Sequence, residues 1–582
     1  MRRISFLAVV LATAAMLVPL APAQATSSFT FFGSGYGHGI GLSQWGAFGL
    51  ASDGWSHQQI LTHFYSGTQV DANASLPGKI RVGLTVDERT IHLKASSGPV
   101  HLWDGEPSTG AAIGTIASGD TWAVSPGKRG AFKVVDASGA TVGGRTWGSR
   151  KRPVFATYED AGARVFVPET DQIYGSGFTY AHGYLEFNTY PSGGNCCLER
   201  LILRIPFEQY LLGIGEVSSS WPMQALESQV DASRTYAAYE MQHFGVRSSC
   251  NCHLTDGGND ETYVGWSKES GTDGDRWVTA VQDTSDEVVT YKGALIQAFF
   301  TASDGGHTES VQNAWHGGDP RYKIPYLRGV CDPGENTSSN PWVSWQRSFS
   351  AADVTSRLQP YTGSIGAISG FAGDVRGSSG RIITIIVSGA NGSLTVTGGQ
   401  LRAALGLPDD RVWVNSDRNV VGPIRAFYDQ VNCKPGLPTT PQLVLADGSR
   451  QLFDKGGIYQ NSRLGVVTYL RGTILEEYRT VGGVYGVLGW PASSVVKLSA
   501  DTGGCTGCAR VDFDHGRIYE MKSTGAHALW GAVLGAYLDG GGAGGALGMP
   551  TSTVRTADDG STSATFEHGS IACPASGSCS VS

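Results

Sequence analysis

The stretch of sequence that decides the fold runs from residue 211 to residue 240 and reads LLGIGEVSSSWPMQALESQVDASRTYAAYE. Pro222 suits the first position of a helix, and Ser219 or Ser220 can cap its N-terminus. Apolar side chains then recur on one face, at Leu226, Val230, Ala237 and Met241. The stretch therefore predicts one prominent amphipathic helix that begins near Trp221.

The sequence on both sides of this helix is typical of strands. Upstream, short alternating apolar segments such as IRVGLTV and ARVFV are broken by Gly, Pro and Asp turns, which predicts a β-rich subdomain over about residues 75–190. Downstream, EVVTY, ALIQAFF and RIITIIV have the same character. The elements are segregated rather than alternating, so we predict an α+β fold. It comprises a β-rich catalytic domain with the amphipathic helix, followed by a small C-terminal repeat domain.

The C-terminal part of the chain has a different pattern. The segment KPGLPTTP at 434–441 is dense in Pro and turn formers, which predicts a linker over 431–445. Beyond it, FDKGGIY at 453–459 recurs as FDHGRIY and FEHGSI, and LGWP at 488–491 recurs as LGMP. A repeat of about 55 to 60 residues predicts stacked small units over 446–582.

These repeated motifs closely resemble the LGFP-repeat family of secreted actinobacterial proteins, with Trp or Met here in place of the Phe. The resemblance implies attachment to a cell-wall polymer. A purely structural repeat domain is the plainer alternative.

The N-terminal residues MRRISFLAVVLATAAMLVPLAPAQA predict a secretory signal peptide over 1–25. The apolar run is short for a membrane span and contains Pro19, so we expect cleavage before Thr26 and no membrane span afterwards. Removal of Arg2 and Arg3 lowers the net charge from −8 to −10, in a chain with only 16% charged residues. This charge argues against nucleic-acid binding.

The chain has ten cysteines, and an even number in an exported protein favours disulfides. The close pairs Cys505/Cys508 and Cys573/Cys579 can each close a loop, whereas the first six cysteines can pair in several ways. Zinc is the rival interpretation for the isolated Cys505-x-x-Cys508 pair.

Glu216 lies in a Gly-rich turn just ahead of the predicted helix. A partly desolvated carboxyl group beside an aromatic ring has a raised pKa, which suits a general acid. The same position also suits an acidic residue that only stabilises a helix N-terminus. From this chemistry alone, the structural interpretation comes first.

The stretch resembles the signature of the sporulation stage II protein D and amidase-enhancer family. In that family a Glu precedes Ser-Trp-Pro and an Ala-x-x-Ala-Arg-Thr-Tyr helix, and it is the catalytic acid of a lytic transglycosylase. The matching residue here is Glu216. Further family blocks occur in the expected order. Ile205–Leu211 lies before Glu216, and Cys252–Tyr263, Ser303–Glu309, Gly380–Arg381 and Leu401–Arg402 lie after it. The resemblance implies one such domain over 26–430.

Two features depart from the family pattern. The block GYGHGIGLSQWGAFGLA at 35–51 normally closes the domain but opens it here, which is the order of a circular permutation. Permutation is tolerated where chain ends lie close together, so we expect residues 35–67 to pack beside the catalytic helix. In addition, Asp231 and Glu261 stand where the family usually has Ala and Gln. Asp231 could reshape substrate contacts or the pKa of the acid.

The block at 35–51 has two interpretations. Its closely spaced glycines can form a tight turn in which His38 only satisfies backbone groups. We favour a sugar-contacting loop in which His38, Ser43 and Gln44 form hydrogen bonds and Trp45 offers a stacking face. Further substrate contacts are assigned to Gln229, Arg234, Tyr236, Ser303 and Thr308. Arg234 could equally be a structural anchor that pairs with a carboxylate.

We expect no cofactor and no catalytic metal. His38 has no metal-ligating partners that the sequence identifies. Some family members bind zinc through Cys and His after the catalytic helix, which leaves a structural zinc near Cys250, Cys252 and His253 as an alternative.

The resemblance implies a secreted, cell-wall-associated lytic transglycosylase that cleaves peptidoglycan glycan strands. In such an enzyme the 6-hydroxyl of muramic acid attacks the anomeric carbon, so Glu216 alone can serve as acid and then as base, leaving a 1,6-anhydro end. Hydrolysis would need a second carboxylate, from Asp231, Asp256 or Glu261. The alternatives are a non-catalytic peptidoglycan-binding amidase enhancer, with a cell-wall amidase as partner, and a wall-anchored binding protein.

Overall fold

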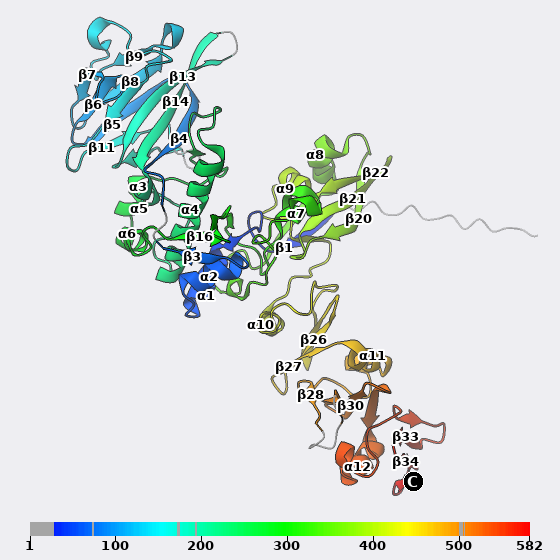
Figure 1. Cartoon of the computed structure of the whole chain (residues 1–582). Helices are drawn as coiled ribbons and strands as arrows, with labels where there is room; N and C mark the ends of the chain where they lie inside the picture. The colour runs from blue at the N-terminus through cyan, green and yellow to red at the C-terminus, as the bar shows by residue number, and fades with distance from the viewer. Residues whose placement is uncertain (1–27, 73–74, 171–174, 193–194, 500–504, 506) are drawn as a thin grey trace, which may run out of the picture.

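The computed structural model describes residues 28–72, 75–170, 175–192, 195–499, 505 and 507–582 (Figure 1). The signal peptide expected at 1–25 lies outside these residues. Within the described part of the chain, no helix is both long and apolar enough to cross a membrane. Helices and strands are mixed and the strands form many separate small sheets, which confirms the α+β class.

The predicted helix is α4 (Met223–Phe244), and it begins one residue after Pro222. The serine cap is wrong, because Pro222 occupies the cap position and no side chain bonds the first turn. The helix is also buried on more sides than an amphipathic pattern predicts, since several elements pack around it. These elements are α1 (Gln44–Ser52), α2 (His57–Phe64), α3 (Phe207–Leu211), α6 (Gly274–Asp283) and β16 (Val288–Tyr291).

The β-rich unit consists of two antiparallel-rich sheets at one end of the molecule (Figure 1). One sheet has the order β15-β4-β14-β13-β10-β6-β7, with β4 (Lys79–Glu88), β6 (Val100–Asp104), β7 (Ala111–Ile116), β10 (Val154–Thr157), β13 (Tyr184–Ser192), β14 (Asn195–Pro206) and β15 (Leu254–Thr255). The other has the order β12-β11-β5-β8-β9, with β5 (Ile91–Ser97), β8 (Thr121–Pro126), β9 (Phe132–Val135), β11 (Arg164–Val167) and β12 (Phe178–Tyr180). Strand β14 runs directly into α3, so the unit extends beyond the expected boundary near 190.

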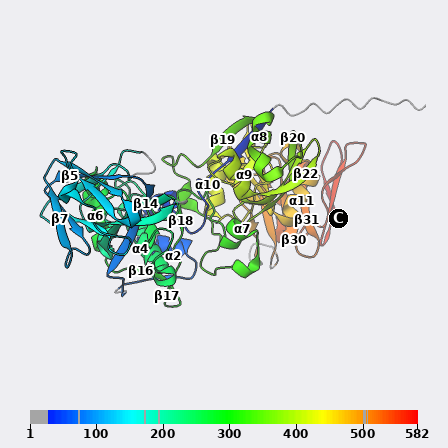
Figure 2. The same cartoon turned by 90° about the horizontal axis from the view of Figure 1, so that it is seen from above.

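The N-terminal segment pairs with four strands that lie far away in the sequence. Strand β1 (Ser28–Gly33) lies between β19 (Trp345–Ser350) and β23 (Val412–Val414). Strand β2 (Leu42–Ser43) pairs with β18 (Phe300–Thr301), and β3 (Gln69–Asp71) pairs with β16. Helix α2 lies beside α4 and β16 in both views (Figures 1 and 2). The expected packing of residues 35–67 beside the catalytic helix is therefore confirmed.

A second α/β unit lies further along the chain, between residues 351 and 405. It holds β20 (Ile368–Arg376), β21 (Ile382–Gly389) and β22 (Gly392–Thr397), with α8 (Ala351–Thr362) and α9 (Gly398–Leu405) packed against them. Its hydrophobic core also takes Phe29 and Phe31 from β1. The smaller elements between the units are α5 (Trp266–Ser270), α7 (Val311–His316) and β17 (Ala294–Leu295).

The C-terminal part of the described chain repeats one unit, a helix followed by a four-stranded sheet (Figure 1). The first repeat comprises α10 (Gly422–Gln430) with β24 (Leu443–Leu445), β25 (Gly448–Phe453), β26 (Gly456–Asn461) and β27 (Val466–Leu470). The second comprises α11 (Gly472–Thr480) with β28 (Val496–Lys497), β29 (Ala509–Phe513), β30 (Gly516–Met521) and β31 (Gly525–Trp530). The third comprises α12 (Gly531–Asp539) with β32 (Arg555–Thr556), β33 (Thr562–Phe566), β34 (Gly569–Cys573) and β35 (Ser580–Val581).

A tyrosine from each repeat helix holds the motif turn of its unit. The hydroxyl of Tyr478 donates to Gly489 O at 2.6 Å, and that of Tyr537 donates to Gly548 O at 2.8 Å. The hydroxyl of Tyr428 donates in the same way to Gly436 O at 2.9 Å. The sequence PGLP at 435–438 is therefore a first copy of the motif. The linker expected at 431–445 thus lies inside a folded repeat.

Disulfides reinforce this part of the chain. The two pairs expected from spacing, Cys505–Cys508 and Cys573–Cys579, are confirmed. Cys331 pairs with Cys433 and so joins the loops near the cleft to the first repeat. The Cys196 side chain lies outside the described residues.

Gly486→Ala should destabilise the second repeat. An added Cβ would lie 1.8 Å from the carbonyl oxygen of Val481, a backbone atom that cannot move without shifting the turn. We expect local stability to fall by about 1–3 kcal/mol, measured as faster amide hydrogen exchange in β29 and β30. The control is Gly535→Ala inside α12, where an added Cβ meets no atom within 4 Å and stability should rise by about 0.5–1 kcal/mol. Equal exchange in both variants would contradict the packing argument.

Candidate active site

A cleft of about 370 Å³ lies where the N-terminal segment meets the turn between α3 and α4. Loops around residues 258–262 and 299–302 complete its walls. Four of the residues predicted from the sequence line this cleft, namely His38, Gln44, Glu216 and Tyr236. Segments that are far apart in the chain thus contribute to one concave surface, which is the usual form of a binding site.

The glycines around Glu216 allow a close backbone approach. The Gly215 N–H donates to Thr262 O at 2.8 Å. A Cβ on Gly213 would lie 2.5 Å from the ring of Tyr263. Small residues are needed at this turn, which holds Glu216 beside the backbone of Thr262.

Neutral donors hold the Glu216 carboxyl group. Its Oε1 accepts the Thr262 N–H at 2.6 Å, and its Oε2 accepts a hydrogen bond from Gln44 Nε2 at 3.3 Å. Burial raises the pKa of Glu216, and these bonds and the charge of Lys268 offset only part of that rise. The carboxyl group is thus more easily protonated than an ordinary Glu, which suits a general acid.

Gln44 connects the acid to helix α4. Its Nε2 also donates to Gln229 Oε1 at 3.3 Å, and Gln229 Nε2 donates to Ser233 Oγ at 3.1 Å. Gln44 is the first residue of α1, whose N-terminus is capped by Ser43. The N-terminal block therefore supplies Gln44, which donates a hydrogen bond directly to the carboxyl group of Glu216.

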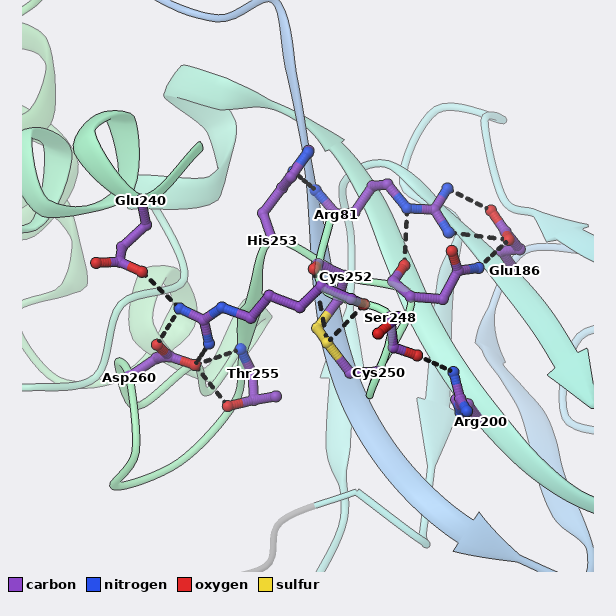
Figure 3. The surroundings of a disulfide bond; sticks show 12 residues. Arg81, Glu186, Arg200, Glu240, Ser248, Cys250, Cys252, His253, Thr255 and Asp260 are labelled. Carbon is purple, nitrogen blue, oxygen red and sulfur yellow. Dashed lines mark hydrogen bonds and ion pairs between the residues drawn. A yellow bond between two sulfur atoms is a disulfide. The ribbon is translucent and has the colours of Figure 1, made fainter. Parts of the chain in front are cut away.

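Asp260 is a second carboxylate in the cleft, and sequence reasoning missed it. Tyr236 Oη donates to its Oδ1 at 3.0 Å, and Arg247 forms an ion pair with it at 2.7 Å. The Thr255 N–H donates to its Oδ2 at 2.9 Å (Figure 3). Burial raises the pKa of Asp260, but these bonds outweigh it and the pKa lies below its ordinary value. The cleft therefore contains one carboxyl group that favours its acid form and one that favours its ionised form. Two sequence signals mark this loop, namely the family-like block Cys252–Tyr263 that contains it and the pair of glycines just before Asn259.

The carboxylates that the sequence offered for hydrolysis lie elsewhere. Asp231 is buried on α4 and pairs with Arg234 at 2.8 Å. Asp256 accepts the Tyr263 N–H at 2.8 Å. Glu261 is buried, accepts from Tyr210 Oη at 2.8 Å, and burial raises its pKa to about 8. Among the described residues, none of these three carboxylates lines the cleft.

Aromatic side chains form exposed walls of the cleft. Tyr36 is 43% exposed and stacks on Trp342, with ring centroids 4.4 Å apart. Trp315 is 46% exposed and contacts the ring of His38 at 5.2 Å. Neither Tyr36 nor Trp315 was singled out from the sequence. Flat exposed rings of this kind suit the apolar faces of sugar rings.

His38 is a neutral ring within this wall, and it bonds the backbone of both Ile40 and Phe300. Its Nδ1 accepts the Ile40 N–H at 3.0 Å, so the ring proton lies on Nε2. Burial, together with the charges of Arg381 and Arg402, lowers the pKa of His38 to about 3. Trp45 instead packs against Trp221, with ring centroids 4.8 Å apart.

Four residues assigned to substrate contact have buried side chains that bond within the protein. Ser43 Oγ and Ser303 Oγ both donate to the carboxylate of Glu335. Thr308 Oγ1 accepts the Val330 N–H at 2.8 Å. Arg234 pairs with Asp231 and Glu208. The structure does not bring these four side chains to the cleft. Nor does Gln229 line it, because its side chain is buried and bonds Gln44 and Ser233.

The residues considered for zinc do not fit a zinc site in this structure. Cys250 and Cys252 form a disulfide, and zinc requires free thiolates (Figure 3). His253 Nδ1 accepts the Arg81 N–H at 3.1 Å, so this ring nitrogen is occupied too. The disulfide lies at the base of the loop that carries Asp260 (Figure 3).

Comparisons with known proteins agree with this organisation. Residues 199–291 match the family model for Stage II sporulation protein, and residues 488–545 match the LGFP repeat. An uncharacterized protein of Brachyspira hyodysenteriae is 31% identical over 152 residues, which are 25% of this chain and 37% of that protein. The amidase enhancer of Bacillus subtilis is 29% identical over 142 residues, which are 24% of this chain and 17% of that protein.

The chain thus matches well under half the length of either relative. The first family match contains Glu216, α4 and Asp260, and the second starts at the LGWP motif. The chain therefore contains a stage II sporulation protein domain and an LGFP repeat region. These are the two families whose motifs its sequence resembles.

Proposed function

We propose that this protein acts on the bacterial cell wall as a lytic transglycosylase, with Glu216 as the acid and then the base. The observation that carries the proposal is a partly buried carboxyl group with a raised pKa, held by neutral donors in a cleft with aromatic walls. The substrate is the glycan strand of peptidoglycan. The family match and the amidase-enhancer relative support a cell-wall role.

The acid proton resides on Oε2 of Glu216. Oε1 accepts the short bond from the Thr262 N–H at 2.6 Å, whereas the bond from Gln44 to Oε2 is longer, at 3.3 Å. In the first step Oε2 gives its proton to the glycosidic oxygen, and the C–O bond breaks to leave an oxocarbenium ion. In the second step the carboxylate takes the proton of the 6-hydroxyl while that oxygen attacks the anomeric carbon.

Asp260 supplies negative charge to the cleft during this reaction. Its ionised state favours the positive charge of the oxocarbenium ion. Both of its oxygens already accept hydrogen bonds, so it is a poor nucleophile or base for water. This arrangement favours intramolecular transglycosylation over hydrolysis.

The LGFP repeats would hold the enzyme on a cell-wall polymer, and the signal sequence would direct the chain out of the cell. A second candidate function is peptidoglycan binding that stimulates a separate amidase. The observation that favours it is the relative named amidase enhancer. In that case the same cleft binds glycan without cleaving it.

Glu216→Gln should abolish cleavage while the fold is kept, because the amide has no acid proton to give. Purified glycan strands, with and without stem peptides, are incubated with the mature protein or the variant, and the products are identified by mass spectrometry. We expect anhydro-ended fragments from the wild type and a rate at least about 100-fold lower from the variant. Intact strands from both proteins would favour the binding or amidase-enhancer function.

Asp260→Asn should slow cleavage without changing its product. The amide keeps the size of the side chain but removes the charge that favours the oxocarbenium ion, so we expect a fall in kcat of about 10- to 100-fold. The fragments should still carry anhydro ends. Reducing ends in the wild type that disappear in this variant would instead identify Asp260 as the base of a hydrolase.

The pH profile of cleavage should depend on Gln44. The acid form of Glu216 is required, so kcat should fall as the pH rises through its pKa. Gln44 bonds the carboxylate and lowers that pKa, so Gln44→Leu should move the basic limb of the profile to higher pH. Gln58→Leu on the exposed side of α2 is the control and should leave the limb in place. A shift to lower pH in Gln44→Leu would contradict the assignment.

A further inference from the structure

Three potential ligand atoms converge on the side of α4 that faces α2. They belong to His57 at the start of α2, Asp231 within α4 and Glu287 just before β16, and all lie within 4.8 Å of one another. His57 Nε2 lies 3.0 Å from Glu287 Oε2 and 3.9 Å from Asp231 Oδ2. None of these residues lines the cleft that holds Glu216.

Asp231 Oδ2 is an oxygen without a hydrogen-bond partner. The Asp231 side chain is 0% exposed, and its Oδ1 accepts from Arg234 at 2.8 Å, but Oδ2 has no partner of its own. A buried carboxylate oxygen normally has one, because leaving it unpaired is destabilising. This oxygen is directed towards His57 Nε2 and Glu287.

The spacing and chemistry of the three atoms fit a divalent transition metal. An ion with tetrahedral bonds of about 2.0–2.2 Å places its ligands roughly 3.3–3.6 Å apart. One imidazole nitrogen and two carboxylate oxygens form a donor set that zinc accepts. His57 and Glu287 are 13% and 19% exposed, so water can reach a fourth position.

The other ring nitrogen of His57 already has the partner that a metal-bound histidine needs. His57 Nδ1 lies 2.9 Å from Glu227 Oε2 on the preceding turn of α4. In the tautomer protonated at Nδ1, this atom donates to Glu227 and leaves the lone pair of Nε2 free. A carboxylate in this outer position orients the ring and makes it a better ligand.

The local charge also favours a bound cation. The charged groups in contact here are the carboxylates of Glu208, Glu227, Asp231 and Glu287, with Arg234 as their cation besides His57. With a neutral His57, four carboxylates face one guanidinium. A divalent ion reduces this excess negative charge more than a proton on His57 does.

We propose that His57 Nε2, Asp231 Oδ2 and Glu287 Oε2 bind a zinc-class divalent ion. The ion links the N-terminal segment to the catalytic helix, since α2 follows α1 and α1 carries Gln44. The proposal does not rest on the proposed function.

Titration of the mature full-length protein with zinc chloride after chelator treatment tests the site. Calorimetry and elemental analysis should give one equivalent of zinc for the wild type. Asp231→Asn and Glu287→Gln should each weaken this binding by more than about 100-fold, and Glu227→Gln by about 10- to 100-fold. His92→Gln removes an exposed histidine that pairs with Glu169 and should leave the affinity unchanged.

Cobalt absorption gives an independent measurement that does not depend on the stability of the variants. Cobalt bound to the wild type should give visible bands of a four-coordinate ion, and zinc should displace it. Full-affinity binding in both Asp231→Asn and Glu287→Gln would overturn the proposal, as would no stoichiometric zinc in the wild type. In the latter case a protonated His57 is the cation, since the hydrogen bonds that it donates to Glu227 and Glu287 outweigh burial and raise its pKa to about 9.

Discussion

The backbone pairing of the N-terminal segment with distant strands is the interaction on which the candidate site depends. Strand β1 is hydrogen-bonded on both edges, to β19 and to β23, and β2 and β3 add further pairs. These ladders fix the segment that carries Tyr36, His38 and Gln44. Without them, Glu216 would lose the Gln44 donor and the cleft would lose one wall.

Glu216 is largely buried and forms no ion pair with another described residue, which distinguishes it from Asp260 and Asp231 nearby. Asp260 pairs with Arg247, and Asp231 pairs with Arg234, so each is bonded to a fixed positive charge. Glu216 accepts hydrogen bonds from the Gln44 amide, the Thr262 N–H and the Thr262 side chain, all of which are neutral donors. Because neutral donors stabilise a carboxylate less than a guanidinium does, its proton is retained to higher pH.

Much of the organisation could be predicted because it depends on local or repeated patterns. The helix at 223–244, the position of Glu216 before it and the repeat period follow from spacing in the sequence. The role of Asp260 could not be predicted, because it depends on Arg247 and Tyr236 meeting it in space. Nor could the sequence separate residues that serve the fold from those that face substrate. Ser303, Thr308 and Arg234 lie in motifs that resemble those of the family, yet their side chains are buried.

The first repeat was missed for a related reason. Its motif reads PGLP, so its prolines resemble those of a linker, and only the Tyr428 bond to Gly436 identifies it as a repeat turn.

The disulfide between Cys331 and Cys433 closes a loop of 102 residues. A mechanical force can therefore pass between these two residues without passing through the chain between them. If the repeats are held on a wall polymer, tension on them passes through this covalent link to Cys331. The next residues, Asp332 to Glu335, form the turn whose Glu335 carboxylate holds Ser43, the cap of α1. The unit formed by β20, β21 and β22 lies within the closed loop and is spared the load. A pull on the anchored end would therefore be felt at the helix that carries Gln44.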